Sequence, residues 1–196
     1  MLTTWLNSLE RSYGSPRKSC EFGVAQYAYV VDGMPGLIRR VRQHMKMECG
    51  LTIRWDNEVR LGRNTPMTIY IPEPMPPYGS KEYKATKFLL EIQRSSLEPM
   101  GVRAIAFGIA HELSHILLDS TGHQYRKEEK FVDLTAMYMG FDEFLYHSRF
   151  NSTRYTRMET IMDVLKGALL KKNYGYLTDD EVESAFQMIE DRKNKK

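Results

Sequence analysis

The chain has 196 residues, of which 42% are hydrophobic and 27% are charged, which excludes a largely disordered protein and suits one domain spanning residues 1–196. The net charge of +3 is too small to predict a nucleic-acid partner, and two cysteines, Cys20 and Cys49, are too few for a disulfide framework. Neither a signal peptide nor a long uninterrupted apolar segment is visible, so we expect a cytoplasmic protein without a membrane span.

The first hundred residues are expected to form a small sheet with flanking helices. Residues 24–31 fit either a strand or a helix, and the apolar residues of 37–47 recur at helical spacing up to Gly50. Residues 51–55 and 67–71 are rich in β-forming residues and predict two strands. Four prolines between residues 72 and 77 then predict a loop, because proline cannot continue strand pairing.

The rest of the chain, including residues 101–196 with the candidate metal site, is expected to be helical. Apolar periodicity predicts helices over 83–97, 102–118, 128–146 and 157–170, with a bend in the third at Gly140. A last helix is expected to begin at Thr178, where Glu181 follows three residues later as in a capping box. Strands early and helices late predict an α+β fold.

A metal-binding motif lies in the most apolar predicted helix, as His111-Glu112-Leu113-Ser114-His115. Histidines four residues apart share one helix face, one turn apart, and can ligate the same zinc ion. Glu112 is then placed to take a proton from a metal-bound water. A chance match is the alternative, but His, Glu and His in an apolar helix are costly to bury without a partner.

A catalytic zinc needs a third protein ligand. We expect Glu129, because Asp133 lies four residues later on the same helical face and can accept a hydrogen bond from a liganding histidine. His123 remains the main alternative ligand. The charge-rich segment 126–130 is otherwise interpreted as a solvated surface.

The arrangement HExxH followed by Glu129-Lys130-Phe131-Val132-Asp133 resembles the gluzincin pattern of zinc metallopeptidases. Thermolysin-like enzymes and the HtpX or CAAX-processing type share this pattern, and ImmA/IrrE-like peptidases also carry HExxH. The resemblance covers about residues 102–141. It implies a zincin-like fold, one Zn²⁺ per chain on His111, His115 and Glu129, a general base at Glu112, and a supporting role for Asp133.

The function expected from these residues is zinc-dependent hydrolysis of peptide bonds, with a peptide or protein as the substrate. Strand 67–71 (Met67, Thr68, Ile69, Tyr70, Ile71) is a candidate edge strand for an extended peptide, with a core strand as the alternative. Candidates for a transition-state donor are His123, Tyr125 and His147. A regulatory or structural zinc-binding module and a metal-dependent hydrolase of non-peptide amides are the alternative functions.

Overall fold

A three-stranded mixed sheet forms the base of the protein, whose computed structural model describes residues 1–56, 66–97, 100–150 and 175–195. Strand β1 (Gly50–Asp56) pairs in parallel with β3 (Lys87–Gln93), and β2 (Met67–Tyr70) pairs antiparallel with the other side of β3. The strand order is therefore β1-β3-β2, which leaves β2 at an edge of the described sheet. Both strands that were expected from the sequence are present.

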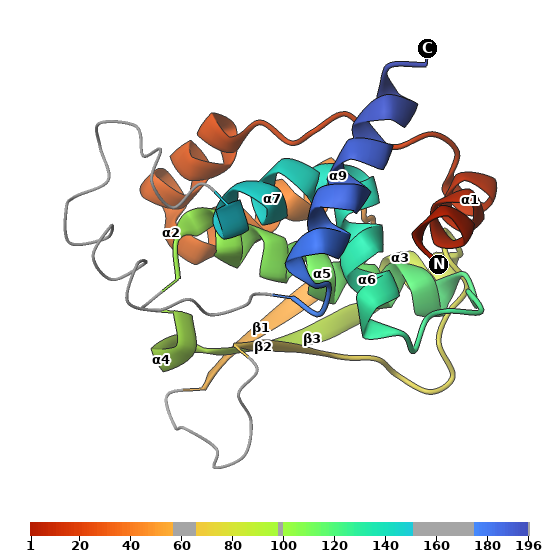
Figure 1. Ribbon diagram of the computed structural model, residues 1–196. Helices are drawn as coiled ribbons and strands as arrows, with labels where there is room; N and C mark the ends of the chain where they lie inside the picture. Colours follow the sequence, from red (N-terminus) through yellow and green to blue (C-terminus); the bar gives the residue numbers. More distant parts are fainter. Residues whose placement is uncertain (57–65, 98–99, 151–174, 196) are drawn as a thin grey trace.

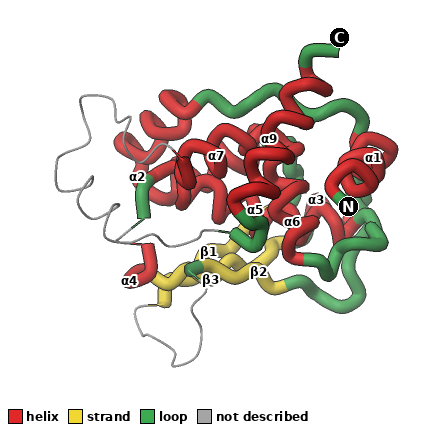
Figure 2. Tube along the Cα trace, in the orientation of Figure 1, coloured by secondary structure: helices red, strands yellow, loops and turns green. Residues whose placement is uncertain are grey.

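Helices cover one side of this sheet (Figure 1), and the tube in Figure 2 shows the strands gathered together beneath them. The N-terminal helices are α1 (Leu2–Tyr13) and α2 (Phe22–His44), so residues 24–31 are helical. Two short helices, α3 (Lys81–Ala85) and α4 (Arg94–Leu97), flank β3. The long helix α5 (Val102–Ser120) lies among α2, β2, α6 and α7 and carries the histidine motif.

The single helix predicted over 83–97 is wrong, because the middle of that segment is the central strand β3, and only its ends belong to the short helices α3 and α4. Its apolar residues satisfy a helical spacing, but Phe88, Leu90 and Ile92 also alternate, and all three are buried. Pairing with β1 on one side and β2 on the other satisfies the backbone of β3. These long-range hydrogen bonds override the local pattern.

The helical C-terminal half follows the sequence closely. Helix α6 (Glu129–Ala136) continues through a π-helical turn, η1 (Met137–Phe141), into α7 (Asp142–Phe150). The bend falls at Gly140, whose φ of 96° favours glycine and whose Cβ, if present, would lie 2.5 Å from His44 Nε2. Helix α9 (Asp179–Lys193) begins with the expected capping box of Thr178 and Glu181. The predicted helix over 157–170 lies outside the described residues.

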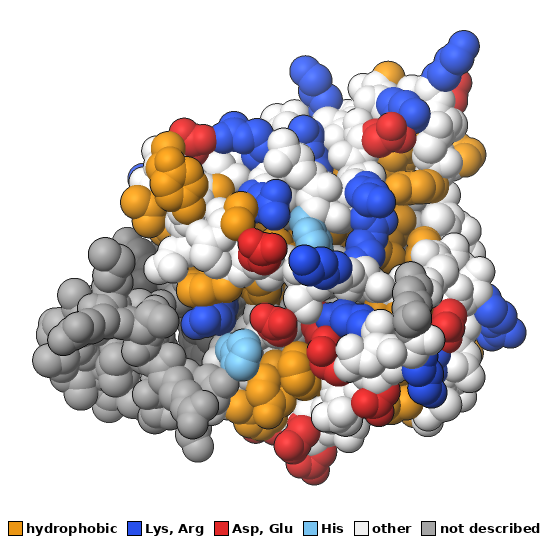
Figure 3. All heavy atoms as spheres, turned by 90° about the horizontal axis from the view of Figure 1, so that it is seen from above, with side chains coloured by type: hydrophobic (Ala, Val, Ile, Leu, Met, Phe, Trp, Pro, Cys, Tyr) orange, Lys and Arg blue, Asp and Glu red, His pale blue; other side chains and the backbone are white. Residues whose placement is uncertain are grey.

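The hydrophobic core draws on both halves of the chain. It joins Trp5 of α1, Leu37 of α2, Phe88 of β3, Phe107 of α5 and Ile189 of α9. Within the described part of the chain, no helix is both long enough and apolar enough to cross a bilayer. Figure 3 looks down on the helical face, where lysine and arginine side chains are interspersed with acidic ones and form no continuous basic surface.

Candidate metal centre and active-site cleft

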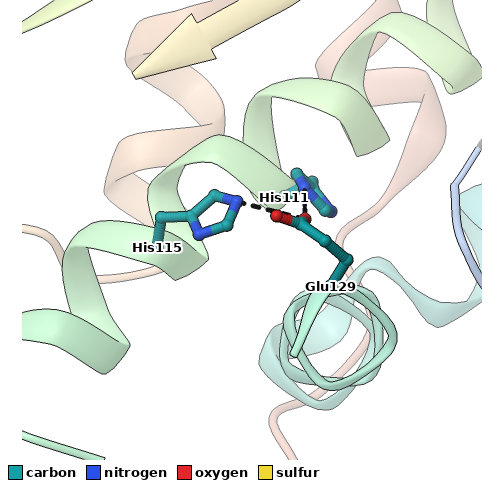
Figure 4. A group of neighbouring side chains, drawn as sticks. All are labelled: His111, His115 and Glu129. Carbon is teal, nitrogen blue, oxygen red and sulfur yellow. Dashed lines mark ion pairs between the residues drawn. The ribbon is translucent and has the colours of Figure 1, made fainter. Parts of the chain in front are cut away.

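The two motif histidines point from one face of α5 toward the first residue of α6 (Figure 4). His111 Nε2 lies 3.3 Å from Glu129 Oε2, and His115 Nε2 lies 3.5 Å from the same oxygen. One ligand atom from each of the three residues lies within 4.8 Å of the others. The helical repeat places the histidines one turn apart, and the packing of α6 against α5 brings the carboxylate to them.

This spacing fits a zinc ion. Zn²⁺ bound to nitrogen and oxygen at about 2.0–2.1 Å in a tetrahedron requires ligand atoms about 3.3–3.4 Å apart. The two observed nitrogen-to-oxygen distances of 3.3 and 3.5 Å lie close to that value. Two neutral imidazoles and one carboxylate also form a donor set that zinc prefers, and they leave a fourth position for water or substrate.

Electrostatics at the three residues favour a cation. Burial alone would lower the pKa of His111, but its hydrogen bonds with Asp133 and Glu129 raise that pKa to about 10. The hydrogen bonds from His111 and His115 lower the pKa of Glu129 well below its ordinary value. The raised pKa of His111 reflects the carboxylates of Asp133 and Glu129, and the lowered pKa of Glu129 reflects the two imidazoles that face it. A divalent metal could replace the protons that the imidazoles share with this carboxylate.

Asp133 lies directly behind this cluster and is fully buried. Its Oδ1 is 2.8 Å from His111 Nδ1, so a proton on Nδ1 leaves Nε2 free to face Glu129 and a metal. Its Oδ2 accepts hydrogen bonds from the backbone N–H groups of Tyr176 and Leu177, the latter at 3.1 Å. One carboxylate therefore joins the histidine to the segment that leads into α9.

Gly175 makes this connection sterically feasible. Its φ is +83°, and an added Cβ would lie 2.7 Å from Asp133 Oδ2. Any other residue would be strained in this conformation and would also push against the carboxylate. The sequence therefore needs glycine here for the two following amides to reach Asp133.

Glu112 faces the cleft between α5 and the edge strand. Its Oε2 accepts a hydrogen bond of 2.8 Å from the backbone N–H of Ile69 in β2. Burial raises the pKa of this carboxyl, with the nearby histidines opposing the shift. A carboxylate with a raised pKa that is fixed beside a metal-ligand set is suited to accept and return a proton.

The cleft has a volume of about 300 Å³, at the lower end of the range for small-ligand sites. Its walls include four of the five residues of the expected substrate strand, Met67, Thr68, Ile69 and Ile71, together with the whole metal cluster and Glu112. Tyr70 is not among the lining residues, and its hydroxyl donates to Glu91 on the neighbouring strand.

The three candidates for a transition-state donor do not line this cleft. The Nε2 of His123 contacts Ser8 Oγ at 3.2 Å, and its ring stacks on Phe131, so its side chain is also not part of the metal cluster. Tyr125 packs its ring on Phe131, and His147 lies on α7 with its ring near Tyr146. These placements correct the sequence analysis, because local patterns do not show where the return between α5 and α6 turns or which way α7 faces.

Tyr176 lines the cleft and was not found from the sequence. Its ring stacks on His111 with centroids 5.6 Å apart and an interplanar angle of 24°. Burial and the charge of Glu129 raise the pKa of its phenol, which therefore stays protonated and able to donate. No motif spacing singles out this residue, since it lies 47 positions after Glu129 and reaches the cleft only through the docking of Gly175–Leu177 on Asp133.

Comparisons with known proteins give no relative: no family model, no curated protein and no solved structure matches the chain. The geometry of the cleft is therefore the basis for any statement about function.

Proposed function

We propose that the protein is a zinc-dependent peptidase of the zincin type, with a gluzincin-like ligand set. The observation that carries this proposal is the convergence of His111 Nε2 and His115 Nε2 on Glu129 Oε2 in a cleft that also holds the carboxyl of Glu112. A structural zinc site is normally closed by four protein ligands, whereas three ligands in an open cleft are typical of a catalytic site. The neighbouring base favours hydrolysis over a purely structural role.

When bound, zinc would supply a Lewis acid and lower the pKa of a bound water to about 7. The chain's own residues supply the proton transfer and the positioning. Glu112 accepts a proton from the attacking water and passes it to the leaving amine, and the N–H of Ile69 fixes the orientation of its carboxylate. Asp133 fixes the ring of His111 through Nδ1.

The edge strand supports a peptide as the substrate. The N–H of Ile69 points away from β3 and toward the cleft, so the main chain of alternate residues in β2 faces the same way. The N–H of Ile69 itself is held by Glu112, so an extended peptide would add to this edge through the other main-chain groups that face the same way. Such main-chain hydrogen bonds recognise a polypeptide without regard to its side chains. A non-peptide amide would make no use of such an edge.

Tyr176 is our candidate for the group that stabilises the tetrahedral intermediate. It has a protonated hydroxyl, it lines the cleft, and its backbone is held by the carboxylate that also holds His111. A preorganised donor at a developing oxyanion contributes roughly a hundredfold to a thousandfold in rate.

Zinc analysis and a cleavage assay test the proposal together. We expect about one zinc per wild-type chain, a sharp loss in Glu129→Ala, and retained zinc with strongly reduced cleavage of a random peptide library in Glu112→Gln. Glu82→Gln, on the surface helix α3, is the matched control and should leave both properties unchanged. Wild-type protein that takes up no zinc, or that keeps equal activity in Glu112→Gln, would refute the proposal.

A further inference from the structure

Two cations line one end of the cleft on the loop between α5 and α6. Arg126 Nε lies 3.3 Å from Asp119 Oδ1, and Lys127 Nζ lies 3.9 Å from the same oxygen. Arg126 also donates through an Nη atom to the backbone carbonyl of His123 at 3.3 Å. All three charged side chains are among the lining residues, together with the metal cluster.

The charges at this end do not balance. Among the described residues, both cations form their ion pairs with Asp119, so two positive charges share one carboxylate. The other two acidic residues that line the cleft, Glu112 and Glu129, belong to the metal centre. Asp119 is largely buried, with 12% of its side chain exposed, whereas Arg126 and Lys127 are 41% and 78% exposed. The exposed ends of the cations are therefore available to an anionic group in the cleft.

The direction of β2 determines which part of a peptide would reach these cations. Met67 lies against Gly108, Ile69 bonds to Glu112, and the N–H of Tyr78 donates to the carbonyl of Ser120. The strand and α5 therefore run in the same direction, and Ile71 lies toward the end of the cleft that holds Asp119. A peptide that adds antiparallel to β2, the more stable pairing, has its N-terminal part at this end.

We propose that Arg126 and Lys127 form a subsite for an acidic side chain of the substrate, on the N-terminal side of the cleaved bond. This inference rests on the proposed peptidase function and narrows its substrates to peptides with aspartate or glutamate there. A carboxylate that enters this end of the cleft meets two partly exposed cations that share one buried carboxylate, and Arg126 and Lys127 donate to it.

The test uses the zinc-loaded protein and a random peptide library with acetylated N-termini and amidated C-termini, with cleavage sites read by mass spectrometry. We expect aspartate and glutamate to be enriched N-terminal to the cleaved bond. A matched pair of peptides that differ only by glutamate or glutamine at the enriched position should differ in kcat/KM by about twofold to fivefold, the range for exposed ion pairs. This ratio should fall as salt is added.

Variants then assign the preference to the two cations. The Glu-to-Gln ratio should approach one in Lys127→Gln combined with Arg126→Gln, and it should invert in Lys127→Glu. A general loss of activity caused by a shifted loop affects both peptides equally, so it does not change this ratio. Lys81→Gln, an exposed residue of α3 outside the cleft lining, is the control and should keep the wild-type ratio.

The outcomes are distinguishable. Zinc-dependent cleavage without an acidic preference, or with a preference that survives in the double variant, would overturn this inference and leave the peptidase proposal standing. A preference on the C-terminal side, or one for a free C-terminal carboxylate over the amide, would overturn it as well. A complete lack of zinc-dependent cleavage would overturn both proposals.

Discussion

Replacing Asp133 by asparagine should damage the fold and the metal site together, because asparagine keeps the shape but cannot accept all three hydrogen bonds. Asp133 accepts from the ring of His111 and from the backbone amides of Tyr176 and Leu177. In the variant, the amide oxygen can face either the histidine or the two backbone amides. The NH₂ group of the asparagine then faces an N–H donor on the other side and cannot accept a hydrogen bond from it.

The magnitude follows from this conflict. With the oxygen toward the two backbone amides, one hydrogen bond between His111 and a charged group is lost, which costs about 1.5–3 kcal/mol, and the remaining bonds weaken because the acceptor is now neutral. We expect a decrease of about 2–4 kcal/mol in the free energy of unfolding. The NH₂ group would also favour a proton on Nε2 of His111, so zinc affinity should fall by about tenfold to a hundredfold.

Urea unfolding of the zinc-free protein and a competition titration with a chromophoric chelator measure the two effects separately. Asp191→Asn is the control, because Asp191 is exposed on α9 and accepts a hydrogen bond from Gln187 on the surface. Its unfolding free energy and zinc affinity should stay close to those of the wild type. If Asp133→Asn stays within about 0.5 kcal/mol of wild type and binds zinc within about twofold, Asp133 does not have the role assigned to it.

Three further changes test other parts of the structure. Gly175→Ala should lower the free energy of unfolding by about 1–3 kcal/mol because of its positive φ and the contact with Asp133, and equal stability by urea unfolding would contradict the described turn. Tyr176→Phe should keep its zinc, measured by elemental analysis, and lose about a hundredfold to a thousandfold in kcat. An unchanged kcat would exclude Tyr176 as the donor, and Tyr125→Phe is the matched control. Adding zinc at about a hundred times its Kd should raise the free energy of unfolding by about 2.7 kcal/mol, and a melting temperature that does not respond to zinc or to a chelator would contradict a site in the folded state.

Local sequence patterns were sufficient to predict several helices of this protein and the placement of its two motif histidines. The apolar periodicity of residues 102–118 predicts α5, and the four-residue spacing then places His111 and His115 on one face of it. Thr178 and Glu181 mark the start of α9, and Gly140 marks the bend before α7. Each of these features depends on residues within one or two helical turns, where dihedral preferences and side-chain spacing are sufficient.

The tertiary structure decided the features that depend on residues far apart in the chain. Residues 87–93 are a strand because β1 and β2 both pair with them, although their spacing also fits a helix. Tyr176 belongs to the cleft because its own backbone amide and that of Leu177 donate to Asp133, while His123 is directed to Ser8 and away from the cleft. The sequence suggests that Arg126 and Lys127 belong to a solvated charged surface, whereas the fold places both residues in the lining of the cleft. Such placements follow from packing and hydrogen bonds across the chain, which no local pattern encodes.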